Sequence, residues 1–159
     1  MKTLILFASA TGTAEKCALR LSELIPGSEA VDVKKAIPDP NGYERIIIGG
    51  SIRAGRISKK LSEYVNNTLP VLLNKELGVF ICCGDAAKAN EYIVENFPGE
   101  LIMKAKRCMC FGGEYDIKNA HGFDKLILKL IRKTAGAGLE EIHIDYDRVA
   151  EFAALFGGE

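Results

Sequence analysis

The chain has 159 residues, the usual length of one domain, and a domain of this size can bury a core without disulfides or metals. Hydrophobic residues make up 48% and charged residues 26%, which excludes a disordered or fibrous chain. Lys plus Arg and Asp plus Glu both count 21, so the formal net charge is zero and no nucleic-acid partner is expected. No stretch reaches the roughly 18 consecutive apolar residues of a membrane span.

The chain contains five cysteines, Cys17, Cys82, Cys83, Cys108 and Cys110. Their number is odd, and no CxxC pair or histidine-containing zinc cluster is present. We therefore expect buried free thiols, no bound metal, and the reducing environment of the cytoplasm.

In chain order, we predict strands at 3–8, 29–33, 45–50, 77–84 and 107–113. The segment at 29–33 alternates and suits a sheet edge, whereas the other four are apolar throughout, as strands covered on both faces are. The first of them, in MKTLILFASA, is too short for a typical signal peptide.

Helical periodicity falls between these strands, at 14–25, 58–69 and 87–97, and again at 146–156 after Asp145 as a plausible N-cap. Alternating strands and helices predict a parallel sheet with helices on both faces. We expect a single α/β domain over residues 1–159, doubly wound, with five strands in the order 2-1-3-4-5. Its ligand crevice would lie at the carboxyl ends of strands one and three.

The junction after the first predicted strand, FASATGTAEKC (7–17), places hydroxyl residues and a glycine before a helix. Amides at a helix start have no partner within the helix, and the helix dipole favours an anion there. Ser9, Thr11 and Thr13 would add hydroxyl donors, and Gly12 would let the backbone approach a phosphate. Neither GxxxxGK[ST] nor GxGxxG occurs. The alternative is a capping turn whose Ser and Thr only satisfy helix donors.

Two neighbouring strands end in similar loops, GGSIRAGR (49–56) and CCGDAAK (82–88). Small residues and free backbone groups suit a flat ligand that inserts between two loops. Three such loops at adjacent strand ends favour a crevice for a planar, phosphate-bearing molecule.

The stretch SATGT (9–13) resembles the FMN phosphate loop of the flavodoxin family, (S/T)-x-T-G-x-(T/S), and CGD (83–85) resembles its second flavin loop. Ala14 stands where a hydroxyl residue is usual, so only its amide is available. This resemblance implies FMN as the cofactor. The FMN-binding residues that we predict are Ser9, Ala10, Thr11, Gly12, Thr13, Ala14, Ser51, Ile52, Arg53, Ala54, Gly55, Cys83, Gly84 and Asp85.

Flavodoxins usually cover the flavin ring with aromatic side chains, but the matching positions here are Ile52, Arg53, Ala54, Ala86 and Ala87. The chain also has no tryptophan. A ring without aromatic cover is more accessible to a second planar molecule. One hypothesis is that Arg53 stabilises a reduced, anionic flavin. The alternative is that Arg53 is an ordinary surface arginine.

Residues 123–133, FDKLILKLIRK, predict an amphipathic helix with a basic face, which either contacts an anionic membrane surface or packs on the core. This segment, with 43–56, 111–116 and 145–153, resembles the flavodoxin-type, quinone-dependent protoporphyrinogen oxidases of bacteria. The resemblance implies an oxidoreductase that passes electrons to a quinone or another redox partner, in the cytoplasm or at the membrane periphery. Residues 85–107 are compact where that group carries a longer basic loop.

The second reading is a flavodoxin that carries electrons without a substrate of its own, although such carriers tend to be acidic. No acid–base set marks a catalytic residue, and a homodimer over the uncovered ring is left open. The acidic cluster of a receiver domain, the phosphatase Cys–Arg spacing and the hydrolase GxSxG motif are all missing. An interaction module with an empty crevice is the remaining alternative.

Overall fold

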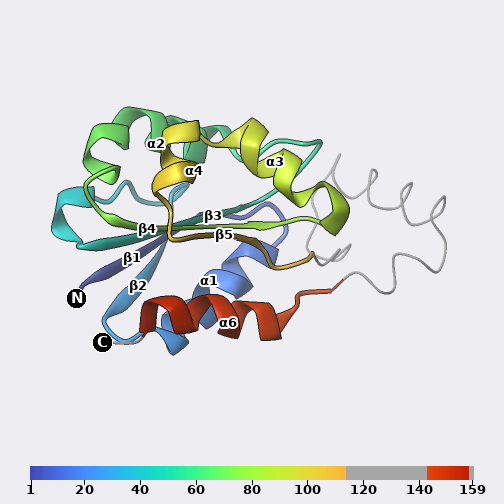
Figure 1. Cartoon of the computed structure of the whole chain (residues 1–159), viewed down its shortest axis with the longest axis horizontal. Coiled ribbons are helices and arrows are strands. Elements are labelled where there is room, and N and C mark those ends of the chain that lie inside the picture. The colour runs from blue at the N-terminus through green and yellow to red at the C-terminus, as the bar shows by residue number, and fades with distance from the viewer. Residues whose placement is uncertain (114–142, 158–159) are drawn as a thin grey trace, which may run out of the picture.

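The computed structural model describes residues 1–113 and 143–157 of the chain. Its centre is a five-stranded parallel sheet in the order β2-β1-β3-β4-β5, which confirms the predicted topology (Figure 1). The strands are β1 (Thr3–Ala8), β2 (Ser28–Asp32), β3 (Arg45–Ser51), β4 (Glu76–Cys82) and β5 (Arg107–Cys110).

Helices cover both faces of the sheet, in two layers that Figure 1 separates clearly. The first layer contains α2 (Lys59–Leu72), α3 (Ala89–Asn96) and α4 (Gly99–Lys104), and the second contains α1 (Thr13–Leu24) and α6 (Tyr146–Gly157). Two short 3₁₀ turns, η1 (Pro40–Gly42) and η2 (Ala86–Lys88), complete the described elements.

Helix α4 was not predicted, because six residues are too few to show a helical period. The preceding helix was predicted to end at residue 97. That helix does end there, with Phe97 at its C-cap. Pro98 then stands at the N-cap of α4, where a missing N–H costs nothing because no helical hydrogen bond uses it.

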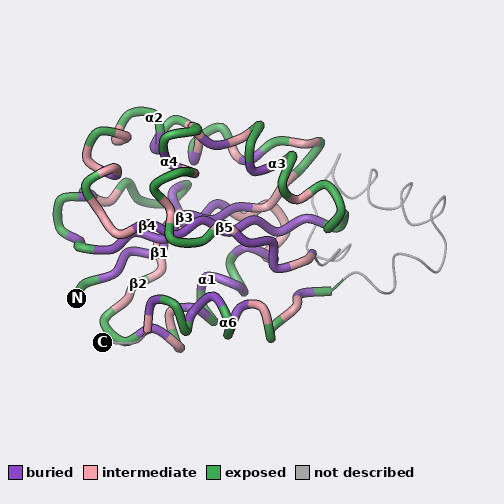
Figure 2. Tube along the Cα trace, viewed as in Figure 1, coloured by how far each residue is buried: buried purple, intermediate pink, exposed green. Residues whose placement is uncertain are grey.

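The side chains of the apolar strands divide between two cores, one on each face of the sheet. Figure 2 shows the central strands as buried between the two layers of helices. In β1, Leu4 and Leu6 belong to the core under α2 and α4, whereas Ile5 and Phe7 belong to the core under α1 and α6. This split follows from the two-residue period of a strand. It explains why the central strands lack the polar alternation of a one-sided sheet.

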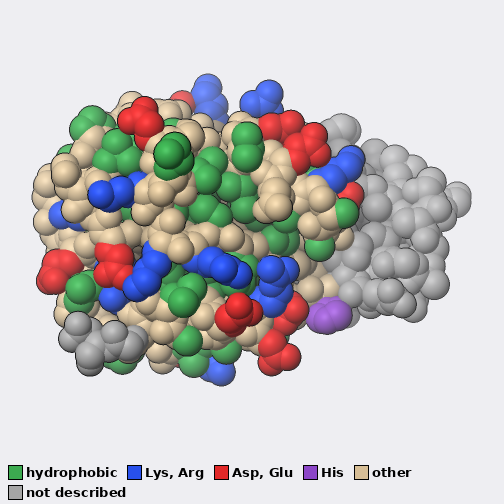
Figure 3. Space-filling model, viewed as in Figure 1, with side chains coloured by type: hydrophobic (Ala, Val, Ile, Leu, Met, Phe, Trp, Pro, Cys, Tyr) green, Lys and Arg blue, Asp and Glu red, His purple; other side chains and the backbone are tan. Residues whose placement is uncertain are grey.

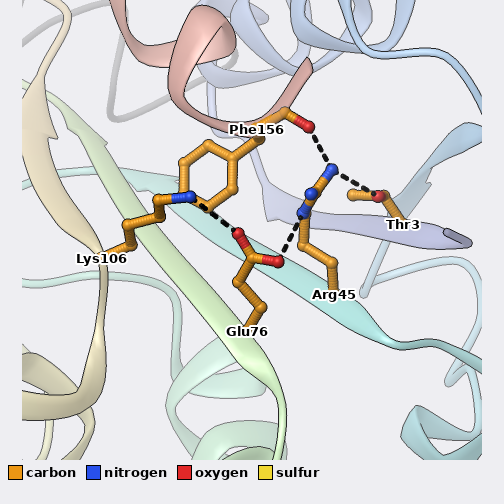
Figure 4. A network of polar contacts seen from close by, with 5 residues as sticks. All are labelled: Thr3, Arg45, Glu76, Lys106 and Phe156. Carbon is orange, nitrogen blue, oxygen red and sulfur yellow. Dashed lines mark hydrogen bonds and ion pairs between the residues drawn. The ribbon is translucent and has the colours of Figure 1, made fainter. Parts of the chain in front are cut away.

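A polar network at the amino ends of the strands fixes α6 to the sheet (Figure 4). The guanidinium of Arg45, 5% exposed, donates to the main-chain carbonyl of Phe156 and lies 3.3 Å from Glu76. Lys106 lies 3.1 Å from the same carboxylate. Burial acts to raise the pKa of Glu76, but the contacts with Lys106 and Arg45 outweigh it and lower that pKa. This network lies at the opposite end of the sheet from the predicted site.

The surface in Figure 3 carries basic and acidic side chains interspersed, in keeping with the zero net charge. Over the described ranges, none of the helices has the length and apolar character needed to cross a membrane. The predicted amphipathic helix at 123–133 lies outside the described residues.

Candidate functional site

Strand register brings the three predicted loops to one edge of the sheet. Ala8 of β1 pairs with Gly50 of β3, and Ser51 of β3 pairs with Cys82 of β4. The loops that follow β1, β3 and β4 therefore start side by side, at the carboxyl ends of the three central strands. In doubly wound sheets this is where ligands bind.

The first loop ends in a left-handed residue, Gly12, with φ of 95°, at the N-cap of α1. A methyl group added there would meet no atom within 4 Å, so this side of the loop is open. The hydroxyl oxygen of Ser9 accepts from the Gly12 N–H at 2.9 Å, which agrees with the capping-turn interpretation. Gly12 itself offers α1 no side-chain cap. The start of α1, with Thr13 and Ala14, thus keeps the anion-favouring dipole of a helix N-terminus.

Lys34 contacts the first loop, and the sequence analysis missed it. Its ammonium donates to the main-chain carbonyl of Ser9 at 2.9 Å. The backbone carries Lys34 there because Val33 still bonds to Phe7 of β1, by an N–H to carbonyl bond of 2.9 Å. The signal was available in the predicted strand order: a residue just after strand two must lie beside the loop after strand one.

The second loop is a tight turn with an uncommon backbone. Arg53 and Arg56 exchange two main-chain hydrogen bonds, of 2.9 and 3.0 Å. Between them, Ala54 has φ of 51° and Gly55 has φ of 77°, as in a type I′ turn. Ala54 is the one non-glycine residue with positive φ in the described part of the chain. The left-handed conformation costs such a residue about 1 kcal/mol, and strain of this kind tends to occur at functional loops.

Asn96, the last residue of α3, holds this turn in place. Its side-chain NH₂ donates to the carbonyl of Gly55 at 2.9 Å, and its side-chain oxygen accepts from the N–H of Ile57 at 3.0 Å. The same NH₂ group also donates to the carbonyl of Tyr92 at 2.8 Å. A single amide side chain thus ties the second half of the turn, and the residue that follows it, to a helix.

Ser51, at the end of β3, carries a buried hydroxyl oxygen with no hydrogen-bond partner among the described residues. Leaving such a group unpaired costs about 1–3 kcal/mol, so an orphaned buried hydroxyl calls for a partner that the described residues do not supply. Its neighbour Ile52 is only partly buried and continues the pairing with β4, donating its N–H to the carbonyl of Cys82 at 2.8 Å. A polar ligand atom beside the second loop would satisfy Ser51.

In the third loop, Cys83 is buried, whereas Gly84 and Asp85 are exposed. The N–H of Cys83 donates to the carbonyl of Gly112 at 2.9 Å, which joins this loop to the chain after β5. A side chain on Gly113 would lie 2.9 Å from the Cys83 carbonyl carbon and 3.0 Å from the Gly84 nitrogen. Only glycine permits the two backbones to approach so closely.

His143 is a second residue that the sequence did not place at this edge. Ile144 forms a bridge with Gly112, and the Asp145 N–H donates to the carbonyl of Phe111 at 2.8 Å. Residues 143–145 therefore lie beside the chain that leaves β5, and the exposed His143 is at the same end of the sheet as the three loops.

All five cysteines are free, and all except the half-buried Cys108 are buried, so the predicted thiols are confirmed with that one difference. Among the residues described, no cluster of His, Cys, Asp or Glu has the arrangement of a metal site.

A family model for the flavodoxin domain matches residues 4–140, and the chain therefore belongs to the flavodoxin family, as its loops predicted. Among curated proteins, it is 28% identical over 170 aligned positions to protoporphyrinogen IX dehydrogenase (quinone) of Escherichia coli strain K12. That alignment covers 96% of this chain and 93% of the relative.

Solved structures support the fold. The flavodoxin of Streptococcus pneumonia TIGR4 superposes with a TM-score of 0.57 at 14% identity, over 98% of this chain and 97% of that one. A flavoprotein from Bacteroides eggerthii gives a TM-score of 0.52 at 16% identity, over 84% of this chain and 98% of that one.

Proposed function

We propose that this chain binds FMN at the three loops and acts as a protoporphyrinogen oxidase-like flavoenzyme that passes electrons to a quinone. The observation that carries the proposal is the nearly full-length match to a relative named as a quinone-linked protoporphyrinogen IX dehydrogenase. The match extends over nearly the whole of both chains, 96% of this one and 93% of that one, which supports a similar activity.

The described residues fit FMN. The first loop would hold the phosphate with amides from Thr11 to Ala14, with the Lys34 ammonium alongside. The second loop would meet the polar edge of the flavin with its backbone and the orphaned Ser51 hydroxyl. When bound, FMN supplies the redox chemistry itself, by accepting and releasing one or two electrons.

Small side chains at the ring favour an enzyme over a carrier. The residues expected there are small: Ala54, Gly84, Ala86 and Ala87. Gly84, Ala86 and Ala87, which follow β4, are exposed. A ring framed by such residues leaves one face open to a flat molecule such as a porphyrinogen or a quinone. His143, which is exposed at this end of the sheet, would offer an acid–base group there.

The alternative function is a flavodoxin that carries electrons between partner proteins and has no substrate of its own. Family membership is equally compatible with it. A carrier depends on surface charge to steer its partners, whereas this chain has a formal net charge of zero. Peripheral membrane contact through 123–133 and pairing into a homodimer stay predictions.

The test is an anaerobic titration of the purified protein loaded with FMN. Protoporphyrinogen should bleach the flavin absorbance, and a menaquinone analogue should then restore it. Bleaching by dithionite but not by protoporphyrinogen would contradict the enzyme and favour the carrier. Retention of no FMN would contradict both.

A further inference from the structure

Two pairs of cysteine sulfurs lie in contact, one on each face of the sheet. On one face, Cys83 and Cys110 have their sulfurs 3.3 Å apart, at the carboxyl ends of β4 and β5. On the other face, the sulfurs of Cys82 and Cys17 are 3.6 Å apart. The first pair borders the third loop, whereas the second lies within the core under α1 and α6.

Backbone hydrogen bonds fix the first pair in place. The N–H of Phe111 donates to the carbonyl of Ile81 at 2.9 Å, and that of Cys83 donates to Gly112 at the same distance. These bonds flank the two sulfurs and hold the ends of β4 and β5 together. The sulfurs are 3.3 Å apart, so a disulfide bond of about 2.0 Å requires them to approach by about 1.3 Å.

The two thiols differ in acidity. The two sulfurs share a hydrogen bond in which either can be the donor, and this contact with Cys83 is the main cause that lowers the pKa of Cys110 to about 6, while burial acts in the opposite direction. A further hydrogen bond reaches the Cys110 sulfur from the Gly112 N–H at 3.4 Å. The same sharing of a proton raises the pKa of Cys83. These opposite pKa shifts favour Cys110 as the more acidic thiol of the pair.

We propose that Cys83 and Cys110 form a peroxide-reactive dithiol that closes into a disulfide across the ends of β4 and β5. The Cys110 thiolate attacks one peroxide oxygen, the O–O bond breaks, and a sulfenic acid forms while hydroxide leaves. The Cys83 sulfur then attacks the Cys110 sulfur, the S–S bond forms, and the S–O bond breaks. With the protons of both thiols, the two leaving oxygens become two waters. The thiols lose two electrons and the peroxide gains them.

The other three cysteines lack this combination. Burial does not separate the two pairs, since Cys83 and Cys110 are 6% and 3% exposed and Cys17 and Cys82 are 0% and 3% exposed. The pKa of Cys82, however, lies well above its ordinary value because its thiol bonds to Cys17 and is buried. Cys108 has a raised pKa through burial and no thiol partner. Cys83, in contrast, adjoins the exposed Gly84, so a small neutral peroxide has a short path to it.

The experiment uses the purified, reduced full chain without FMN, so it does not depend on the proposed function. After treatment with hydrogen peroxide, free thiols are alkylated in denaturant and peptides are analysed by mass spectrometry. We expect one disulfide that links Cys83 to Cys110, loss of two alkylatable thiols, and reversal by a thiol reductant.

Variants in which a single cysteine is replaced test which residues form the disulfide. Cys83→Ser should abolish the cross-link and, because serine keeps a hydrogen-bond donor beside the Cys110 sulfur, leave Cys110 as a sulfenic acid that a dimedone probe captures. Cys17→Ala and Cys108→Ala should form the cross-link as the parent protein does. The proposal is overturned if the folded parent forms no 83–110 disulfide, or if Cys17, Cys82 or Cys108 is oxidised as fast as Cys110.

Discussion

Replacing Lys34 with methionine removes the ammonium that touches the first loop while it keeps a side chain of similar length. The ammonium lies 2.9 Å from the Ser9 carbonyl, at the loop that would hold the FMN phosphate. A phosphate monoester carries about −1.5 to −2 charges at neutral pH. Lys34→Met should therefore weaken the binding of FMN but not of riboflavin, which has no phosphate.

The magnitude follows from the exposure of Lys34. A pair of unit charges about 4 Å apart in water gains about 1 kcal/mol, and the ordering of an exposed lysine offsets part of the gain from a doubly charged phosphate. A net loss of about 1 kcal/mol corresponds to about fivefold weaker FMN binding. The loss should shrink at about 1 M salt, where charges are screened within about 3 Å.

Fluorescence titration of the apoprotein with FMN and with riboflavin measures both affinities. Lys35→Met is the matched control, because Lys35 is the neighbouring exposed lysine and its loss changes the net charge equally. Equal FMN losses in the two variants would refute a specific contact. An equal loss of riboflavin affinity would show that the substitution disturbs the fold of the loop and does not remove a contact with the phosphate.

Three further predictions concern the first loop, the second loop and the polar network. Thr11→Asp should abolish FMN retention after desalting, since a carboxylate would face the phosphate; normal retention would show that the phosphate lies elsewhere. Ala54→Gly relieves a left-handed alanine, so urea unfolding should show unchanged or slightly higher stability, and a loss above about 1 kcal/mol would contradict the turn. Glu76→Gln should cost about 1–3 kcal/mol at pH 7, because it leaves the buried Arg45 without its carboxylate. The pKa of Glu76 is lowered in the folded state, so this contribution is present above its unfolded pKa of about 4.5 and is lost as pH falls through the folded value. A difference between parent and variant that did not begin to shrink as the pH fell below 4.5 would refute the ion pairs.

Much of the fold was predictable because apolar strand segments alternate regularly with helical segments along the chain. Four apolar runs and the alternating edge segment at 29–33 matched the five strands, and their spacing left room only for crossover helices. Helix α4 was not predicted because its six residues, about one and a half turns, are too few to show a helical period. The edge strand β2 was predicted from the alternating pattern at 29–33, and its residues are partly or fully exposed in the structure.

The candidate site was predictable where it is continuous in the chain and less so where it is assembled from distant parts. The loops at 9–14, 51–55 and 83–85 follow strands and could be located by reading along the sequence. Lys34 and His143 required the topology, since one follows a neighbouring strand and the other returns to the chain after β5. The contact between Cys83 and Cys110 depends on strand register, which apolar runs do not specify.

The central claim is that the three loops bind FMN, and an absorbance spectrum tests it most directly. The purified protein is incubated with FMN, desalted and scanned beside an unfolded control. The account predicts a retained flavin spectrum in the folded protein, with none in the control. A folded chain that retains no flavin would contradict the account and leave the first loop as a helix-capping turn.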